Sequence, residues 1–221
     1  MNIKPDAFTN ARYIVTDGPI GVGKTSLSIL LAKELSARLV LERAEDNPFL
    51  PLFYKDSEHY RFQTQMFFLL NRFSQQQEIS QPDLFTRMTI SDYLFEKDRI
   101  FAYLTLDENE LALYEQVYKI LEPKIVRPDL VIFLQANTDA LVRRIKQRAR
   151  HFESEINYDY VAEVNESYNQ FYFRYNETPL LVINTSDIDF VHHRDDLDDL
   201  LKQILSMKQG TQYYVPTSGR R

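Results

Sequence analysis

Cysteine is absent from the 221 residues of this chain, which excludes disulfide bonds and thiolate metal sites. No apolar stretch approaches the roughly 18 residues that a membrane-spanning helix needs. Residues 1–12 are polar and lack the apolar core of a secretory signal. A basic surplus is also lacking, because 26 Lys and Arg face 32 Asp and Glu, a net charge of −6. We therefore expect a cytoplasmic protein that has neither membranes nor nucleic acids as partners.

The chain has the material for one well-packed domain. Hydrophobic residues make up 44% of it and aromatic residues 13%, which is ample for a core. No repeat or linker divides the sequence. We predict a single domain over residues 13–207, an N-terminal extension over 1–12 and a flexible C-terminal tail over 208–221, because that last stretch is polar and contains Gly, Thr and Ser.

Strand and helix patterns alternate along the chain. Short apolar or β-branched runs predict five strands, at 13–16, 38–41, 85–91, 129–134 and 180–183. Helical spacing predicts helices at 25–39, 49–81 (two helices with a break near 55–58), 106–126, 138–150, 158–176 and 194–207. Short strands separated by helices favour a parallel sheet covered on both faces. The predicted fold class is α/β, with a five-stranded parallel sheet flanked by helices.

Residues 18–25, G-P-I-G-V-G-K-T, match the phosphate-binding loop (P-loop) pattern G-x-x-x-x-G-K-[ST], between a strand and an amphipathic helix. Glycines allow backbone N–H groups to converge on phosphate oxygens, at the N-terminus of the following helix. The glycines of the pattern are Gly18, Gly21 and Gly23. Lys24 would contact the β- and γ-phosphates, and the Thr25 hydroxyl would hold Mg²⁺. We expect this loop, with Ser26 beside it, to bind ATP and Mg²⁺.

A P-loop alone does not distinguish kinases from GTPases, motors or ATPases. The chain has no N-K-x-D motif for guanine and is short for a motor. Residues 143–150, R-R-I-K-Q-R-A-R, are rich in arginine, as are the lids of small-molecule kinases. Arg144 and Arg148 are four residues apart, so they share a helix face and could contact a transferring phosphoryl group. The alternative is a basic helix face that contacts only solvent.

Taken in order, these features resemble the deoxynucleoside kinase family, which includes deoxycytidine, deoxyguanosine and bacterial deoxyadenosine kinases. The resemblance extends from about residue 13 to about residue 190 and implies a P-loop kinase fold with an arginine-rich lid at about 144–156. It implies ATP-dependent phosphorylation of a deoxyribonucleoside 5′-hydroxyl in nucleotide salvage. It also implies a homodimer packed through helices, to which the apolar helices at 62–73 and 106–121 are the expected contributors.

An acidic residue ends the second predicted strand. This is Glu42, and by resemblance it is the general base that takes the proton from the sugar 5′-hydroxyl. A carboxylate can do so when it lies within hydrogen-bond distance of the hydroxyl. Glu45 and Asp46 are nearby acids that could hold this role instead, and Glu42 would then be a surface charge at a strand end.

The resemblance also implies residues that bind the nucleoside. Tyr54 corresponds to the tyrosine that contacts the sugar 3′-hydroxyl. Gln65 and Arg72, seven residues or two helical turns apart, correspond to the glutamine at the base edge and its supporting arginine. An amide can donate and accept at once, which suits a base edge. Three phenylalanines lie nearby, for which a core position is the favoured interpretation: Phe62, Phe67 and Phe68.

The segment T-R-M-T-I-S-D holds two further candidates. By resemblance Arg87 is a catalytic arginine near the 5′-hydroxyl, and Asp92 lies beside the base, paired with Arg72. This pair is more similar to members that accept purines and cytosine than to those restricted to thymidine. The expected substrates are therefore deoxyadenosine, deoxyguanosine or deoxycytidine rather than thymidine.

The chain departs from the family at Thr86, where the resemblance leads us to expect an acid that helps hold Mg²⁺. Threonine is a much weaker metal ligand than a carboxylate. Either Glu42 or Asp17 completes the metal shell, or phosphates, Thr25 and water hold the ion.

The lid and the C-terminal part complete the resemblance. The lid arginines and a following acid at the 3′-hydroxyl correspond to Arg144, Arg148, Arg150 and Glu153. Asp189 and Phe190 occupy the place of the loop that covers the ATP adenine.

Two other functions remain open. A nucleoside monophosphate kinase, such as thymidylate kinase, shares the fold, the loop and the lid. It would need a cation for the phosphate of its acceptor, and Arg72 or Arg87 could serve. A non-catalytic nucleotide-binding homologue is favoured only by Thr86.

Overall fold

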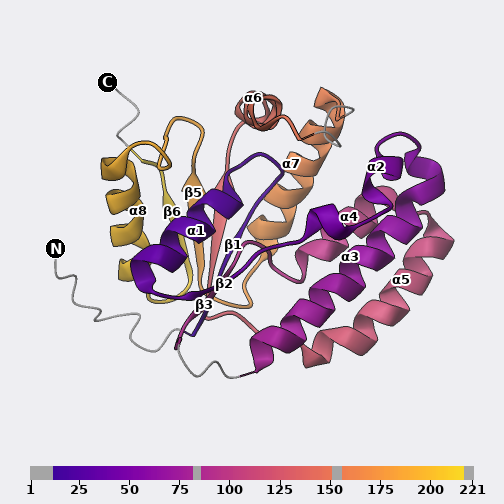
Figure 1. The fold of residues 1–221 in the computed structure, drawn as a ribbon, viewed down its shortest axis with the longest axis horizontal. Coiled ribbons are helices and arrows are strands. Elements are labelled where there is room, and N and C mark those ends of the chain that lie inside the picture. The colour runs from indigo at the N-terminus through magenta and orange to yellow at the C-terminus, as the bar shows by residue number, and fades with distance from the viewer. Residues whose placement is uncertain (1–11, 82–85, 151–155, 217–221) are drawn as a thin grey trace.

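The computed structural model describes residues 12–81, 86–150 and 156–216. Its centre is a parallel sheet of six strands in the order β2-β3-β1-β4-β5-β6 (Figure 1). The strands are β1 (Tyr13–Asp17), β2 (Arg38–Val40), β3 (Thr89–Ser91), β4 (Leu130–Gln135), β5 (Leu180–Asn184) and β6 (Thr211–Tyr214).

Helices cover both faces of this sheet, with α1 and α8 on one side and α3, α4, α5 and α7 on the other (Figure 1). The helices are α1 (Lys24–Leu35), α2 (Leu50–Phe53), α3 (Ser57–Ser80), α4 (Lys97–Thr105), α5 (Glu108–Leu121), α6 (Thr138–Arg148), α7 (Tyr158–Arg174) and α8 (Arg194–Ser206). Of the helices within the described ranges, none is long and apolar enough to cross a membrane.

The alternation of side chains along β4 explains the two layers. Ile132 and Leu134 are fully buried in a cluster shared with α1, α6 and α8. Val131 and Phe133 point to the opposite face, where Phe133 stacks on Tyr172 of α7 with ring centroids 4.0 Å apart. Because both faces are buried, the strand is apolar throughout, as the sequence pattern predicts.

The prediction of five strands is wrong, since β6 forms a sixth. It pairs in parallel with β5, with Tyr213 opposite Val182 and Tyr214 opposite Ile183. Its residues lie in the segment predicted as a flexible tail, so residues 208–216 belong to the domain. A mostly exposed edge strand needs no apolar run, and T-Q-Y-Y therefore gives only a weak sequence signal.

The observed limits of the other helices and strands agree only in part with the predicted ones. The predicted break between two helices is confirmed, because α2 ends at Phe53 and α3 begins at Ser57. The predicted strand at 85–91 is observed only from Thr89. Helix α4 was not predicted at all, since its nine residues begin with three charged side chains. This helix proves important, because it brings Lys97 and Asp98 to the site.

Candidate active site

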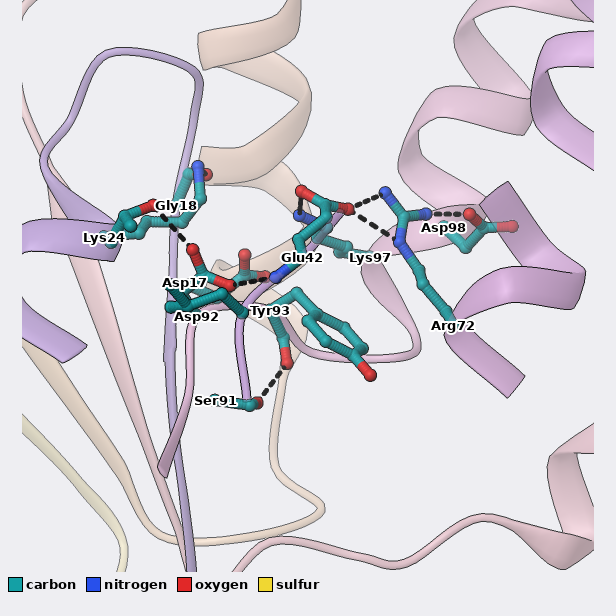
Figure 2. Close-up of polar contacts among 12 residues, drawn as sticks. Asp17, Gly18, Lys24, Glu42, Arg72, Ser91, Asp92, Tyr93, Lys97 and Asp98 are labelled. Carbon is teal, nitrogen blue, oxygen red and sulfur yellow. Dashed lines mark hydrogen bonds and ion pairs between the residues drawn. The ribbon is translucent and has the colours of Figure 1, made fainter. Parts of the chain in front are cut away.

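The carboxyl ends of three neighbouring strands define the site. Strand β1 leads into the P-loop at Gly18, β2 leads to Glu42, and β3 leads directly to Asp92. In a parallel sheet these ends lie at one edge, where ligands of open α/β sheets bind. Figure 2 shows how the side chains from these three ends converge with others from α3 and α4.

The P-loop needs its glycines for conformation and for space. Gly18, Gly21 and Gly23 have φ angles of 147°, 81° and 106°, which side-chain-bearing residues rarely adopt. A Cβ atom on Gly21 would lie 2.8 Å from the carbonyl oxygen of Leu141 in α6. The lid helix therefore packs directly on the loop.

Lys24 lies folded onto the P-loop itself. Its Nζ donates to the carbonyl oxygens of Gly18, at 2.7 Å, and Pro19, at 3.1 Å. Loss of hydration, together with the positive charge of Lys97, lowers the pKa of Lys24 to about 8. Phosphate oxygens would offer this ammonium a stronger, charged partner than two carbonyl groups.

Thr25 and Asp92 place a hydroxyl and a carboxylate oxygen in direct contact within the site. The Thr25 hydroxyl donates to Asp92 Oδ2 at 2.6 Å, and Asp92 Oδ1 accepts from the backbone N–H of Glu42 at 2.7 Å. Burial, and then the charge of Glu42, raises the pKa of Asp92. In P-loop enzymes a loop hydroxyl and an acid from a neighbouring strand together hold Mg²⁺.

The positions of Asp92 and Arg87 correct the expectations for this segment. Asp92 is not paired with Arg72, so the predicted Arg72–Asp92 pair is wrong. The carboxylate that contacts the Thr25 hydroxyl is Asp92, five residues after Arg87 and at the other end of β3 from Thr86, where an acid was expected. Arg87 is exposed and precedes β3, at the edge of the sheet opposite the P-loop. Its predicted place beside the 5′-hydroxyl is therefore wrong as well.

Glu42 lies between two cations, as Figure 2 shows. Its Oε1 accepts from Nε of Arg72 at 2.8 Å and also from Nη2, and its Oε2 accepts from Lys97 Nζ at 2.9 Å. Burial alone would raise the pKa of Glu42, but the charges of Arg72 and Lys97 outweigh it and hold the pKa well below its usual range. The carboxylate is thus ionised and fixed in orientation.

Arg72 is held from both sides. Besides Glu42, it donates from Nη1 to Asp98 of α4, which also accepts from the Tyr114 hydroxyl at 2.7 Å. The guanidinium lies 4.9 Å from the ring centre of Phe68. Asp98 is fully buried, so it reaches a ligand only through Arg72.

A cavity of about 280 Å³ joins the P-loop to the nucleoside-binding candidates. Its lining includes Lys24 and Gln65 together with Glu42, Asp92 and Lys97. Gln65 is 3% exposed, and its Oε1 is a buried acceptor with no hydrogen-bond partner among the described residues. The remaining predicted residues in its lining are Gly21, Thr25, Tyr54, Arg72, Arg148 and Arg150.

The lid arginines divide into two groups. Arg144 donates to the backbone oxygen of Thr185 at 2.5 Å, and burial followed by the charge of Arg143 lowers its pKa. Arg148 and Arg150 line the cavity instead, with Arg150 3.4 Å from Glu45. Glu153 lies outside the described residues.

The loop at 187–190 packs against the P-loop. The Phe190 ring is 5% exposed and would lie 3.1 Å from a Cβ atom on Gly23. Asp189 accepts from the backbone N–H groups of Val191 and His192, which fixes the turn. Ser26 follows in the first turn of α1, partly buried.

Lys97 and Asp98 are site residues that the sequence analysis missed. Both lie in F-E-K-D, in a stretch without a clear helical or strand pattern. The available signal was a lysine between two acids within an otherwise aromatic and aliphatic run, Y-L-F-E-K-D-R-I-F. Such a run suggests a buried charge, and buried charges are paired.

A doubly covered parallel sheet with a P-loop, a Thr–Asp pair and an arginine-bearing helix over the loop is a P-loop kinase fold. The chain belongs to the deoxynucleoside kinase family, because the family model described as "Deoxynucleoside kinase" matches residues 14–208.

Two relatives illustrate the similarity. The deoxyguanosine kinase of Bacillus subtilis (strain 168) is 31% identical over 204 residues, covering 89% of this chain and 98% of the relative. The deoxyadenosine kinase of Lactobacillus acidophilus is 31% identical over 207 residues, covering 87% and 94%. A solved deoxyadenosine kinase from M. mycoides, with products dCMP and dCDP bound, is 26% identical with a TM-score of 0.75, covering 87% of this chain and 98% of that one.

Proposed function

We propose that this protein transfers the γ-phosphoryl group of ATP to the 5′-hydroxyl of a deoxyribonucleoside. One observation carries the proposal: an oriented carboxylate, Glu42, lines the same cavity as the P-loop residues Lys24 and Thr25. A hydroxyl placed against Glu42 would face the phosphates held by the loop, and such positioning supplies most of the catalysis in phosphoryl transfer.

Each residue then has a physical role. The P-loop N–H groups and Lys24 would bind the β- and γ-phosphates, and Arg148, which lines the cavity, would neutralise charge that develops on the transferring group. Arg144, Asp189 and Phe190 would support the loop and its nucleotide. Glu42 would orient the hydroxyl and accept its proton.

Mg²⁺ fits the donor set of the site. Mg²⁺ prefers oxygen ligands and is often bound by one or two carboxylates plus substrate phosphates and water. Thr25 Oγ1 and Asp92 Oδ2, which lie 2.6 Å apart beside the loop, would hold it. The ion would neutralise phosphate charge when bound.

The nucleoside half of the cavity suits a base and a sugar. Gln65 offers a buried acceptor that no described residue satisfies, and Tyr54 lines the same cavity. Relatives of this chain are named as deoxyguanosine, deoxyadenosine and deoxyadenosine/deoxycytidine kinases. We therefore place deoxyadenosine, deoxyguanosine and deoxycytidine ahead of thymidine.

A nucleoside monophosphate kinase is less well supported. Arg72, one of the two cations considered for an acceptor phosphate, is committed to Glu42 and Asp98. Arg87, the other, lies at the far edge of the sheet.

A coupled assay with ATP tests the proposal. The protein is incubated with each of the four deoxynucleosides and, separately, with their monophosphates, and ADP release is measured. We expect turnover with at least one amino-bearing deoxynucleoside and little with thymidine or any monophosphate. Turnover confined to a monophosphate would contradict the proposal, and so would the absence of turnover with every acceptor.

A homodimer packed through α3 and α5 is part of the proposal. Leu70 of α3 is 50% exposed, and Leu113 and Ile120 of α5 are 49% and 62% exposed. Sedimentation velocity of the unmodified protein should give a dimer, and Leu70→Glu combined with Ile120→Glu should give a monomer. Phe173→Glu, on the more exposed Phe173 of α7, is the control and should leave the dimer intact.

A further inference from the structure

Apart from its ion pair with Glu42, Lys97 lies in an unfavourable position for a cation. It is 2% exposed and is the first residue of α4, where the positive end of the helix dipole disfavours a cation. A buried ammonium group also costs free energy unless it is paired. Residues whose placement is unfavourable for stability are expected at functional sites.

The geometry of Glu42 shows what this cation can do. A carboxylate offers about four lone-pair sites over two oxygens. Arg72 uses two on Oε1, through Nε and Nη2, and Lys97 uses one on Oε2. The remaining site is therefore on Oε2, the oxygen that Lys97 holds. Glu42 lines the cavity, so this site is available to a substrate hydroxyl.

We propose that Lys97 is a positioning residue of the reaction centre, which holds Oε2 of Glu42 toward the acceptor hydroxyl. The proposal rests on the proposed function and assigns a residue to it. In the step, the 5′ O–H bond breaks and its proton passes to Oε2 of Glu42. The 5′-oxygen forms a bond to the γ-phosphorus, the bond from that phosphorus to the β,γ-bridging oxygen breaks, and ADP leaves.

Lys97 also affects the charge of the whole centre. Its ammonium group adds positive charge near Lys24 and near the carboxyl groups of Asp17 and Asp92. The ammonium groups of Lys24 and Lys97 would together attract an anion, such as a γ-phosphoryl group.

Two effects of Lys97 oppose each other. Its charge makes Glu42 a weaker base, but its contact fixes the direction of Oε2. Phosphoryl transfer passes through a loose transition state in most analyses, with charge spread over the equatorial oxygens. Base strength then matters less than orientation and positive charge, so removal of Lys97 should slow the reaction.

The test compares Lys97→Met, which removes the charge, with Lys97→Arg, which keeps it. Both are assayed with ATP and the best deoxynucleoside at one fixed pH, and thermal unfolding confirms folding. We expect Lys97→Met to lower kcat about 100-fold with a much smaller change in KM for ATP, as for loss of one charge-stabilising donor. Lys97→Arg should recover kcat to within about tenfold of the unmodified protein.

The split between kcat and KM separates positioning from a structural role. A general loss of structure would weaken ATP binding and raise KM, whereas loss of positioning falls on kcat. Lys202→Met, which removes an exposed lysine paired with Asp199, is the matched control and should change neither kcat nor KM.

Three outcomes overturn the proposal: kcat of Lys97→Met within threefold of the unmodified protein, a loss that falls on KM for ATP rather than on kcat, or no recovery in Lys97→Arg. If Lys97→Met does not fold, Lys97→Gln replaces it under the same criteria. Turnover by the unmodified protein is measured first, so failure of the proposed function appears there and failure of the Lys97 proposal only in the variants.

Discussion

At the scale of single residues, positive and negative side chains alternate through the centre of the site. Asp98, Arg72, Glu42 and Lys97 follow one another in direct contact (Figure 2). Each buried charge has a partner of opposite sign, which offsets part of its desolvation. Removing one member therefore leaves its neighbour uncompensated, and changes that keep shape are the better probes.

Glu42→Gln keeps the shape of the side chain and removes its charge and its basicity. We expect kcat to fall by about 10²–10⁴-fold with a smaller change in KM for the nucleoside, because the amide cannot take a proton. Steady-state kinetics check this, with thermal unfolding to confirm the fold. Glu45→Gln, on an exposed acid beside Arg150, is the control. A loss in Glu45→Gln but not in Glu42→Gln would assign the base to Glu45.

Asp92→Asn tests the metal assignment. The amide retains an oxygen but loses the negative charge beside Thr25. We expect the Mg²⁺ concentration for half-maximal activity to rise about 10–100-fold. Thr86→Ala, at the opposite end of β3, should leave the Mg²⁺ dependence unchanged. If Thr86→Ala shifts that dependence and Asp92→Asn does not, the Thr25–Asp92 site is refuted.

At the scale of elements, most of the architecture could be predicted because its signals are local. The P-loop motif fixes the β1–α1 unit, and the apolar runs of β4 and β5 identify them as buried central strands. The exposed strand β6 and the charged helix α4 lack such patterns, since their pairing depends on contacts with distant segments. Sequence spacing therefore missed both.

The residues around β3 show most clearly which part of the site could not be predicted from the sequence. Arg87 and Asp92 were both assigned to the site by resemblance, Arg87 near the 5′-hydroxyl and Asp92 beside the base. A strand rises about 3.3 Å per residue, so five residues span roughly 16 Å and place the two at opposite edges of the sheet. The correct partner of Thr25 could be identified only once the register of β3 with β1, Val15 opposite Ser91, was known.

Removal of β6 tests whether it is structural. We expect a chain ending after Met207 to lose about 2–4 kcal/mol of unfolding free energy, since several hydrogen bonds to β5 and the packing of Tyr214 are lost. Urea unfolding measures this against a chain that ends after Pro216 and keeps the strand. Equal stability of the two chains would support the original prediction of a loose tail.

At the scale of the whole molecule, buried carboxyl groups make stability depend on pH in two directions. The pKa of Glu42 is held low, because the charges of Arg72 and Lys97 outweigh the effect of burial. The folding stability that the ionised Glu42 contributes is therefore lost as pH falls through that low pKa. Burial raises the pKa of Asp17, which still accepts a hydrogen bond from Tyr172 at 2.6 Å. The folding stability that the neutral Asp17 carboxyl contributes is lost as pH rises through this raised pKa.

Glu96 shows most clearly how a buried carboxyl group with a raised pKa destabilises the protein as pH rises. It precedes α4, is 9% exposed and caps the helix with no side-chain hydrogen bond. Burial, with the charges of Glu177 and Glu122, raises its pKa from 4.5 to about 7. The folded protein therefore binds this proton more tightly than the unfolded chain does. The associated stability is fully present below about pH 4.5 and is lost as pH rises through about 7.

Glu96→Gln should remove that loss, because the amide stays neutral at every pH. One pH unit of difference corresponds to about 1.4 kcal/mol, so we expect the variant to be more stable than the unmodified protein by about 3 kcal/mol at pH 8. The difference should shrink steadily toward pH 5, where both side chains are largely neutral in the folded state. Urea unfolding at pH 5, 6, 7 and 8 measures it, with Glu58→Gln on an exposed acid of α3 as control. A difference between Glu96→Gln and the unmodified protein that is constant with pH would show that Glu96 is ionised in the folded protein throughout, since only a proton bound on folding makes the difference vary with pH.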